Sequence, residues 1–353
     1  SNDFKKLKQC DLVFISEDVK TDFKGKSNLK SLRVLINKTI KFLNKNSVLI
    51  ILSQMRPGFI RSIQINHNKL YHQVETLIFG KAMNRAMYPE RIIVGCKDKS
   101  KKLNSRYKNY LNEFNCKIFK MNYESAEVAK LSINLLLSSS VTITNILTEL
   151  CENVSANWKE IVPALKSDKR IGKYSYIRPG LGISGGNLER DIVTVKNILN
   201  KNSPPRNFLN NILENSKYMK FWVIRTLDKL KILDNKNKMH IGIVGATYKE
   251  NTNSIKNSPT IDLLKILIKK NITIYEPMLN LNLKNNNINQ IKNIKELVSK
   301  NKVIIFMRPW TNLREIQNVS KIIRNKIVID PYGVIDAGYK ENKIKKYFTI
   351  GKS

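Results

Sequence analysis

Short apolar runs alternate with amphipathic stretches along the first third of the chain. The runs that have the pattern of buried strands are 11–16, 47–52, 91–95 and 116–119. Residues 29–44 and 100–114 place apolar side chains at the spacing of a helix. Strands that alternate with helices predict a parallel sheet covered on both faces.

The middle of the chain is predicted to be helical. Apolar positions repeat at spacings of three and four from Tyr123 to about Asn153, with no glycine or proline between them. A helix of this length usually supports an interdomain or dimer contact. Further helical patterns occur at 157–165, 191–200 and 206–231, with a break at Pro204-Pro205.

A second alternation follows a polar boundary at 234–238. Strands are predicted at 239–244, 272–275, 302–307 and 326–330, and a helix at 259–270. The predicted fold class is therefore α/β, with two doubly wound parallel sheets joined by a central region of long helices. The predicted domains are 1–120, 121–233 and 234–353.

The stretch from Asp168 to Asp191, DKRIGKYSYIRPGLGISGGNLERD, is too rich in glycine for a helix or strand. It is predicted to be a loop that cradles a ligand, and the alternative is a flexible linker between domains. Arg170, Arg178 and Arg190 argue against a plain linker, because linkers are usually rich in Ser, Gly or Pro without such charges.

Composition narrows the class of partner. The formal charge of +35 suggests a polyanion, but the basic residues are spread along the chain and accompany many Asn and Ile, as an A/T-rich genome also produces. No nucleic-acid-binding motif is present, so we expect no nucleic-acid function. No apolar run reaches the roughly 18 residues that span a bilayer, and no signal peptide is seen, so we expect no membrane partner. The scattered Cys10, Cys96, Cys116 and Cys151 predict no metal site and a cytoplasmic location.

Candidate chemistry gathers on the long predicted helix. Glu127, Lys130 and Asn134 share one face, which is either solvated or catalytic. Near a buried carboxylate such as Asp191, a lysine and an asparagine can hold a water or an oxyanion. Glu75 is a possible second acid/base group, although taken alone it fits a surface residue better.

A weaker signal follows the predicted strand 239–244. Gly242, Gly245 and Lys249 resemble a loose phosphate-binding turn, which a plain strand–turn–helix explains equally well. Lys249 and Lys256 would supply point charges for a diphosphate.

Five segments in order resemble the UDP-glucose/GDP-mannose dehydrogenase family. In chain order they are AMYPERIIVG at 86–95, ESAEVAKLSIN at 124–134, DKRIGKYSYIRPGLGISGG at 168–186, IGIVGATYKENTNSIKNSPTIDLL at 241–264 and YEP at 275–277. SQMRPG at 53–58 is a weaker match. The resemblance implies Rossmann-like domains and NAD-dependent oxidation of the C6 hydroxyl of a nucleotide sugar for polysaccharide synthesis. It also implies a homodimer formed through the central helix.

The resemblance assigns roles to individual residues. Those implied for catalysis are Glu75, Lys130, Asn134, Asn187 and Asp191. Those implied for substrate binding are Arg170, Arg178, Gly180, Gly182, Ser184 and Lys249, with Arg170 reaching the substrate of the partner subunit. Those implied for cofactor binding are Ser53, Gln54 and Lys256.

The chain also departs from the family pattern. The family oxidises the hydroxyl first to an aldehyde and then to a carboxylate. Asn187 stands where the family has its nucleophilic cysteine, and an amide cannot form the thiohemiacetal needed for the second of these steps. Other departures are Gln54 for threonine, Gln73-Val74 for Asn-Pro, Lys256 for arginine and the surroundings of Tyr332, where an arginine is expected. We expect oxidation to stop at the aldehyde or to continue differently, and the alternative is a catalytically impaired nucleotide-sugar-binding or regulatory homologue. A polyanion-binding protein is a third possibility.

The dinucleotide loop of the family, GxGxxG, should precede residue 11 and is absent from this sequence. We therefore expect the first domain to be incomplete at its N-terminus and to bind NAD poorly.

Overall fold

The computed structural model describes residues 3–22, 25, 27–78, 82–234, 239–250, 252–282, 285–310, 312–335 and 343–352, with the backbone alone at 313–316 and 318. It divides into two compact units. The first comprises residues 1–135 and 190–201, and the second comprises 136–189 and 202–353. Apart from Asp234, the predicted boundary at 234–238 lies outside the described residues.

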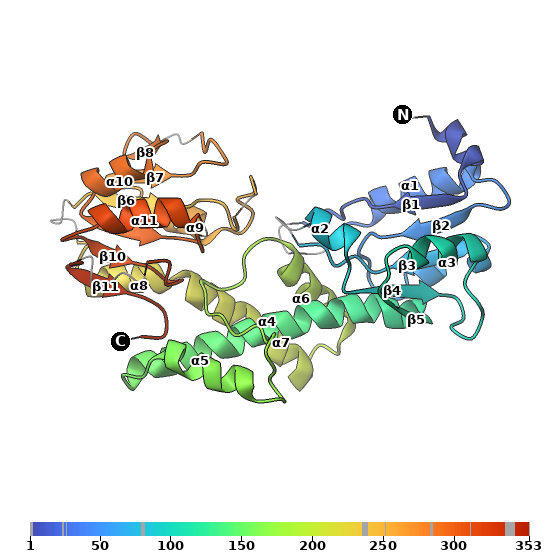
Figure 1. Cartoon of the computed structure of the whole chain (residues 1–353), viewed down its shortest axis with the longest axis horizontal. Helices are drawn as coiled ribbons and strands as arrows, with labels where there is room; N and C mark the ends of the chain where they lie inside the picture. Colours follow the sequence, from blue (N-terminus) through green and yellow to red (C-terminus); the bar gives the residue numbers. More distant parts are fainter. Residues whose placement is uncertain are drawn as a thin grey trace. The chain divides into compact units, whose positions relative to one another are not determined.

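The first unit is built on a five-stranded sheet of order β1-β2-β3-β4-β5. Its elements are the 3-10 helices η1 (Phe4–Gln9), η2 (Ile60–Ser62) and η3 (His67–Lys69), the strands β1 (Leu12–Ile15), β2 (Val48–Ile51), β3 (Leu70–Gln73), β4 (Arg91–Cys96) and β5 (Lys117–Asn122), and the helices α1 (Lys30–Phe42), α2 (Ala82–Met87) and α3 (Ser105–Asn112). Figure 1 shows these elements from blue to teal.

Helices cover both faces of this sheet because the interior strand β2 is apolar on both sides. In β2, Leu49 and Ile51 pack with Leu32 and Ile36 of α1. The alternate residues of the same strand, Val48 and Ile50, pack with Tyr107 and Leu111 of α3. The prediction of a sheet covered on both faces is confirmed.

Two features of the first sheet were not predicted. The stretch before Glu75, which the sequence pattern left irregular, contains the strand β3. This strand lies parallel to β2 but antiparallel to β4, so the sheet is mixed.

The second unit holds a six-stranded sheet of order β11-β10-β9-β6-β7-β8, in which every described pair is parallel. Its strands are β6 (Ile241–Val244), β7 (Ile272–Tyr275), β8 (Ile288–Ile291), β9 (Val303–Phe306), β10 (Ile327–Ile329) and β11 (Lys346–Phe348). Its helices are α5 (Trp158–Ser167), α7 (Pro204–Lys220), α8 (Trp222–Lys229), α9 (Pro259–Ile266), α10 (Ile294–Lys300) and α11 (Leu313–Ile322).

This sheet is also covered on both faces. Ile241 and Ile243 of β6 pack with residues of α8 and α9, and Val244 packs with residues of α10 and α11. In Figure 1 the α10 and α11 helices are drawn in orange and red beside the strands. The α/β fold class with doubly wound sheets is confirmed.

The predicted helical segment 206–231 is two helices, because α7 ends at Lys220 and α8 begins at Trp222. Pro204 and Pro205 do mark a break, but they form the first turn of α7. Proline is favoured there because its missing N–H would have no helical partner.

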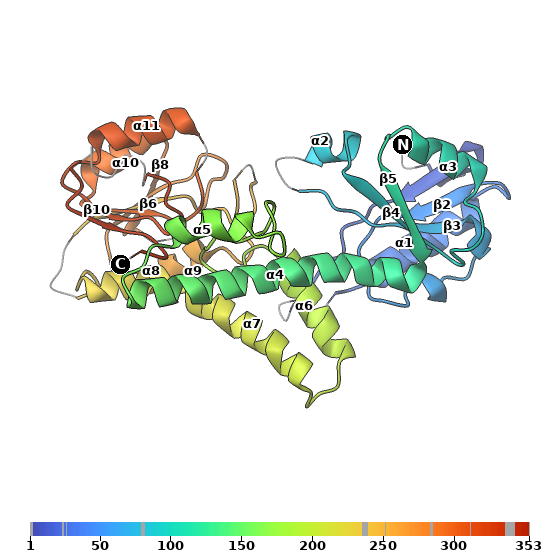
Figure 2. The same ribbon diagram turned by 60° about the horizontal axis from the view of Figure 1, so that its bottom comes forward.

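Two helices contribute to both units. The first is α4 (Tyr123–Asn153), which has the predicted bounds, and the second is α6 (Asn187–Ile198), which begins four residues before the predicted start. Figure 2 shows α4 along its length in green. Among the described residues, α4 alone is long and apolar enough to cross a membrane by length and composition, with a mean hydropathy of 1.4 in an 18-residue window. This is weak evidence, because the core helix of a soluble protein passes the same test.

His72 of β3 predicts an acid-sensitive core in the first unit. The ring is buried, its Nδ1 lies 2.9 Å from the carbonyl oxygen of Ile51, and burial lowers its pKa from 6.5 to about 4. The unfolded chain therefore binds the proton more tightly. This contribution to stability is complete above pH 6.5 and is lost as the pH falls toward 4, and it amounts to about 3 kcal/mol.

The His72→Gln variant should lose most of this pH dependence. The measurement is the free energy of unfolding by urea between pH 4 and 7.5. His240→Gln, at an exposed histidine, is the matched control and should keep the wild-type slope. Equal slopes for the wild type and His72→Gln would contradict the assignment.

Candidate active site

The first half of α4 carries three polar side chains on its inner side. Glu127 and Asn134 are buried, and Lys130 is half-buried. The helix places them there because Lys130 and Asn134 follow Glu127 by three and seven residues, close to one and two turns. The predicted shared face is therefore buried, so the solvated alternative does not apply.

Glu127 holds the loop that follows β2. Its two carboxylate oxygens accept hydrogen bonds from the backbone N–H groups of Gly58, at 2.7 Å, and Ile60, at 3.0 Å. Burial raises the pKa of Glu127, and these two hydrogen bonds oppose the rise. Both oxygens are thus used in supporting a loop, which is a structural role.

Asp191 is the buried carboxylate of the first unit. The Asn134 amide donates to its Oδ2, and Arg190 Nε lies 3.3 Å from its Oδ1. Arg190 is itself 4% exposed and donates a second hydrogen bond to Gln54. The pairing predicted between Asn134 and Asp191 is present, and Arg190 completes it.

Lys130 lies within the electrostatic field of this group. Burial lowers its pKa, the charge of Arg190 lowers it further, and the carboxylates of Asp191 and Glu75 raise it. Glu75 accepts hydrogen bonds from the backbone N–H groups of Thr76, at 2.7 Å, and Leu77, at 2.9 Å, which fix its carboxylate. The structure thus brings four of the five predicted catalytic residues into one electrostatic neighbourhood: Glu75, Lys130, Asn134 and Asp191.

Ser53 and Gln54 lie just beyond the carboxyl end of β2, where ligands of doubly wound sheets bind. Ser53 Oγ and Gln54 Nε2 are buried and have no hydrogen-bond partner among the described residues. Buried polar atoms are nearly always hydrogen-bonded in proteins. These two atoms therefore fit a polar cofactor group such as an amide or a ribose hydroxyl.

The glycine-rich loop belongs to the second unit, and the protein holds it at several backbone atoms. Gly180 N donates to Asn145 Oδ1 at 3.0 Å, and Ile183 N donates to Ser216 Oγ at 2.7 Å. Ser184 Oγ donates to the carbonyl oxygen of Tyr248 at 3.4 Å. Fixed contacts of this kind support a shaped loop and exclude the flexible-linker alternative.

Two of the glycines have backbone angles that other residues rarely adopt. Gly182 has φ +70°, and a Cβ there would lie 2.3 Å from the carbonyl oxygen of Ser216. Gly185 has φ +79°, and a Cβ there would lie 2.8 Å from the Tyr248 ring. Both positions require glycine for conformation and for space.

The basic residues predicted to bind substrate (Arg170 and Arg178) or cofactor (Lys256) lie at different points of the second unit. Arg170 is exposed and forms two side-chain hydrogen bonds with Asp168. Arg178 lies 3.5 Å from the carbonyl oxygen of Tyr332. Lys256 approaches the backbone of Gly186, since a Cβ there would lie 2.8 Å from its Nζ.

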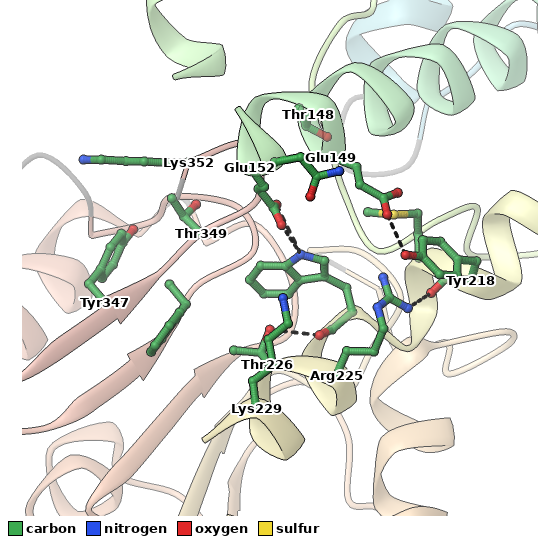
Figure 3. Close-up of a pocket in the computed structure, with 14 residues that line it drawn as sticks. Thr148, Glu149, Glu152, Tyr218, Arg225, Thr226, Lys229, Tyr347, Thr349 and Lys352 are labelled. Carbon is green, nitrogen blue, oxygen red and sulfur yellow. Dashed lines mark hydrogen bonds between the residues drawn. The ribbon is translucent and has the colours of Figure 1, made fainter. Parts of the chain in front are cut away.

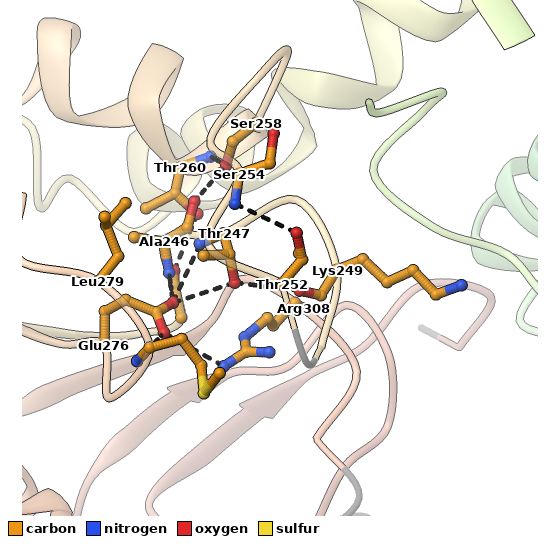
Figure 4. A network of polar contacts seen from close by, with 12 residues as sticks. Ala246, Thr247, Lys249, Thr252, Ser254, Ser258, Thr260, Glu276, Leu279 and Arg308 are labelled. Carbon is orange, nitrogen blue, oxygen red and sulfur yellow. Dashed lines mark hydrogen bonds and ion pairs between the residues drawn. The ribbon is translucent and has the colours of Figure 1, made fainter. Parts of the chain in front are cut away.

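The turn after β6 does not present free N–H groups to a phosphate. Glu276 accepts hydrogen bonds from the N–H groups of Ala246, at 2.8 Å, and Thr247, at 3.0 Å, and Arg308 lies 3.6 Å from its other oxygen (Figure 4). The amides that a phosphate-binding turn would use are thus bound to a carboxylate of the same chain. Lys249 points away from this network in Figure 4.

Two cavities open in the second unit. One, of about 330 Å³, is lined by Trp158, Lys159, Tyr176, Arg178 and Tyr332, among others, and so adjoins the glycine-rich loop. The other, of about 290 Å³, lies at the C-terminal end of α4 (Figure 3). There Glu152 accepts a hydrogen bond from the Trp222 indole, but the lining includes none of the predicted site residues.

Asn187 begins α6 and is exposed, and Asp191 lies one turn further along the same helix.

All four cysteines are free, and the described residues include no group of three or more His, Cys, Asp or Glu side chains that could hold a metal.

The sequence pattern missed several supporting residues. Arg190 was recognised only as a loop charge, and nothing marked Asn145, Ser216 or Glu276 as loop and turn supports. Their partners are distant in sequence, so no local spacing could have identified them.

Two family models match the chain and together cover more than half of it. The central domain of the UDP-glucose/GDP-mannose dehydrogenase family matches residues 124–217, and its UDP-binding domain matches residues 242–337. The UDP-glucose 6-dehydrogenase of Rickettsia prowazekii is 24% identical over 99% of this chain and 83% of its own length. That of Campylobacter jejuni is 29% identical over 73% of this chain and 66% of its own.

Solved structures show the same fold. A UDP-glucose dehydrogenase from Pyrobaculum islandicum has a TM-score of 0.82 at 17% identity and covers 100% of this chain and 83% of its own. A UDP-D-ManNAc dehydrogenase from Pyrococcus horikoshii has a TM-score of 0.79 at 18% identity, over 99% of this chain and 83% of its own. The matches place the chain among the nucleotide-sugar dehydrogenases, a class of oxidoreductase. It belongs to the UDP-glucose/GDP-mannose dehydrogenase family.

Proposed function

We propose that the protein oxidises the C6 hydroxyl of a UDP-linked sugar with NAD, as a step in the synthesis of polysaccharide precursors. The observation that carries the proposal is the buried pair of Asn134 and Asp191 with the half-buried Lys130 beside it. Ionisable and polar side chains gathered in this way at low exposure are typical of functional sites, and members of the family act on nucleotide sugars.

The residues of the first unit would act on the reacting oxygen. The Lys130 ammonium would donate hydrogen bonds to the oxygen as negative charge develops on it. Asn134 and Asp191 would hold a water beside it, and Glu75, fixed by two backbone amides, would take the hydroxyl proton. When bound, NAD supplies the hydride acceptor.

Ser53 and Gln54 would hold the cofactor through the two buried atoms that have no partner among the described residues. Lys256 would add a positive charge for its diphosphate.

Substrate binding is assigned to the second unit. The 180–186 loop, with Gly180, Gly182 and Ser184, would enclose the sugar, and Lys249 and Arg178 would bind the nucleotide diphosphate. The cavity beside Arg178 has the aromatic lining that a nucleoside needs. Arg170 would reach the substrate of a partner subunit in a homodimer formed through α4. The side chains of Leu136 and Leu150 on that helix are more than half exposed, which supports such a contact.

Asn187 determines the expected product. We expect the wild-type protein to release about one NADH per sugar and to accumulate the aldehyde, because no thiolate is present at this position to form the thiohemiacetal. Asn187→Cys should raise the yield toward two NADH and produce the uronate, since a thiol at a helix N-terminus is readily ionised. The measurement is NADH yield and product mass with UDP-glucose, UDP-N-acetylmannosamine and GDP-mannose.

Uronate formed by the wild type at two NADH per sugar would contradict the one-step expectation. Asn187→Ser, which has a hydroxyl in place of a thiol, is the control and should behave as the wild type.

A non-catalytic nucleotide-sugar-binding protein is the second candidate. Asn187, Gln54, Val74 and Lys256 all depart from the family pattern, and Arg190 occupies the side chain of Gln54. Calorimetric binding of UDP-glucose without any NADH from the full-length protein would favour this candidate.

A further inference from the structure

Ile183 is the buried centre of the glycine-rich loop, and side chains from two other segments hold both of its backbone groups. Its N–H donates to Ser216 Oγ of α7 at 2.7 Å. Its carbonyl oxygen accepts a hydrogen bond from Asn257 Nδ2 at 3.3 Å. The path of the loop between Gly182 and Gly185 therefore depends on these two contacts.

Lys220 supports the second contact, the hydrogen bond from Asn257 to Ile183. It follows Ser216 by four residues on α7, so both side chains leave the same face of that helix. Its side chain is 8% exposed, its Nζ donates to Asn257 Oδ1, and it lies 3.9 Å from a carboxylate oxygen of Glu189 in the first turn of α6. A lysine so buried costs solvation free energy, which only specific contacts offset.

The chemistry of this pair sets the direction of the amide. Lysine has three donors and no acceptor, so it can bind only the oxygen of the Asn257 side chain. The Nδ2 group is thereby turned toward Ile183. The backbone of Asn257 has φ 55°, a left-handed conformation that asparagine and aspartate adopt more readily than most residues.

We propose that Lys220 is a positioning residue of the substrate loop, which acts through Asn257 to fix the carbonyl group of Ile183. The inference rests on the proposed role of the 180–186 loop in binding a nucleotide sugar. The proposal assigns Lys220 an indirect role. Its removal should weaken substrate binding although Lys220 itself makes no contact with the substrate.

The first test compares two lysines of the same helix. Lys220→Met removes the donor, and Lys217→Met removes an exposed lysine that pairs with Glu214. Lys220→Met should bind UDP-glucose, or UDP alone, at least about tenfold more weakly by calorimetry, which is the loss of about one hydrogen bond. Lys217→Met should bind as the wild type does.

The second test separates positioning from general stability. Asn257→Asp keeps an acceptor for Lys220 and suits the left-handed backbone, but its carboxylate cannot donate to Ile183. Hydrogen exchange at the amides of 182–186 should accelerate at least about tenfold in both Asn257→Asp and Lys220→Met, while the unfolding temperature of Asn257→Asp stays near that of the wild type.

Wild-type exchange rates at 182–186 in both variants would overturn the inference. If the wild type binds no nucleotide sugar, the proposed function fails, and the exchange rates still decide whether Lys220 positions the loop. If the wild type and Lys220→Met bind UDP-glucose equally well, the role in substrate binding fails.

Discussion

Asp191→Asn should lower kcat for sugar oxidation by about 100-fold or more, the range expected when a group that assists proton transfer or charge stabilisation is lost. The variant keeps the shape of the side chain but replaces Oδ2 or Oδ1 by an amide nitrogen. Asn134 donates to one of these oxygens and Arg190 to the other, so a donor would face a donor. The arrangement that would hold a water beside Lys130 is then broken.

The pH dependence of kcat gives a second readout for this variant. The carboxylate of Asp191 raises the pKa of Lys130, against the effect of burial. Without it, the pKa of Lys130 falls further, and the ammonium loses its proton at a lower pH. The alkaline limb of the profile should therefore move to lower pH in Asp191→Asn.

The matched control is Asp11→Asn, which removes a carboxylate from an exposed pair with Arg106. Its kcat should stay within about twofold of the wild-type value, because exposed ion pairs contribute little. A kcat for Asp191→Asn within threefold of the wild-type value, or an unchanged profile, would remove Asp191 from the mechanism. Calorimetry with UDP-glucose separates a loss of binding from a loss of turnover.

Gly182→Ala should abolish measurable binding of UDP-glucose, a loss of about 100-fold or more, because displacement of a site by about 1 Å has effects of this size. The new methyl group would lie 2.3 Å from the carbonyl oxygen of Ser216. This oxygen belongs to the backbone of α7, so it cannot rotate away as a side chain could. The loop has to move instead, and the contact of Ile183 with Ser216 is lost with it.

Gly172→Ala separates this clash from backbone strain. Gly172 has φ +85°, similar to the +70° of Gly182, but no atom lies within 4 Å of a Cβ built there. Both variants bear the strain of a left-handed alanine, about 1–2 kcal/mol, and only Gly182→Ala adds a steric conflict. Binding of UDP-glucose and the unfolding temperature are measured for both, and equal binding by the two variants would contradict the steric argument.

The two α/β sheets were predictable because each has an interior strand that is a continuous apolar run. SVLIIL and KVIIFM contain β2 and β9, and both strands are fully buried. The strands that escaped prediction are short and polar. In β8, INQI exposes an asparagine, and LYHQ of β3 ends in two polar residues. β8 lies at the edge of its sheet and needs little apolar surface, so the sequence pattern cannot reveal it. β3 is buried in the middle of its sheet, but its apolar run is too short to be recognised because His72 and Gln73 are polar.

The candidate site was predictable in part for a similar reason. Lys130 and Asn134 stand out because they interrupt an apolar helix. Lys220 could not be recognised, because it is one of 63 basic residues and its importance arises only from burial against Asn257. Glu127 was grouped with the catalytic face by its spacing, whereas its carboxylate is used by the amides of Gly58 and Ile60.

The division of the chain has a consequence for its synthesis on the ribosome. The first compact unit is not encoded by one continuous stretch, since it needs residues 190–201 as well as 1–135. Asn134 is therefore synthesised well before Asp191, the carboxylate to which it donates a hydrogen bond. This hydrogen bond cannot form until the residues between them have been translated. A fragment that stops at residue 135 would remove Asp191 from Asn134 and Arg190 from Gln54, and would cut α4 in two. Folding of the chemical centre is thus delayed until the substrate loop has already been made.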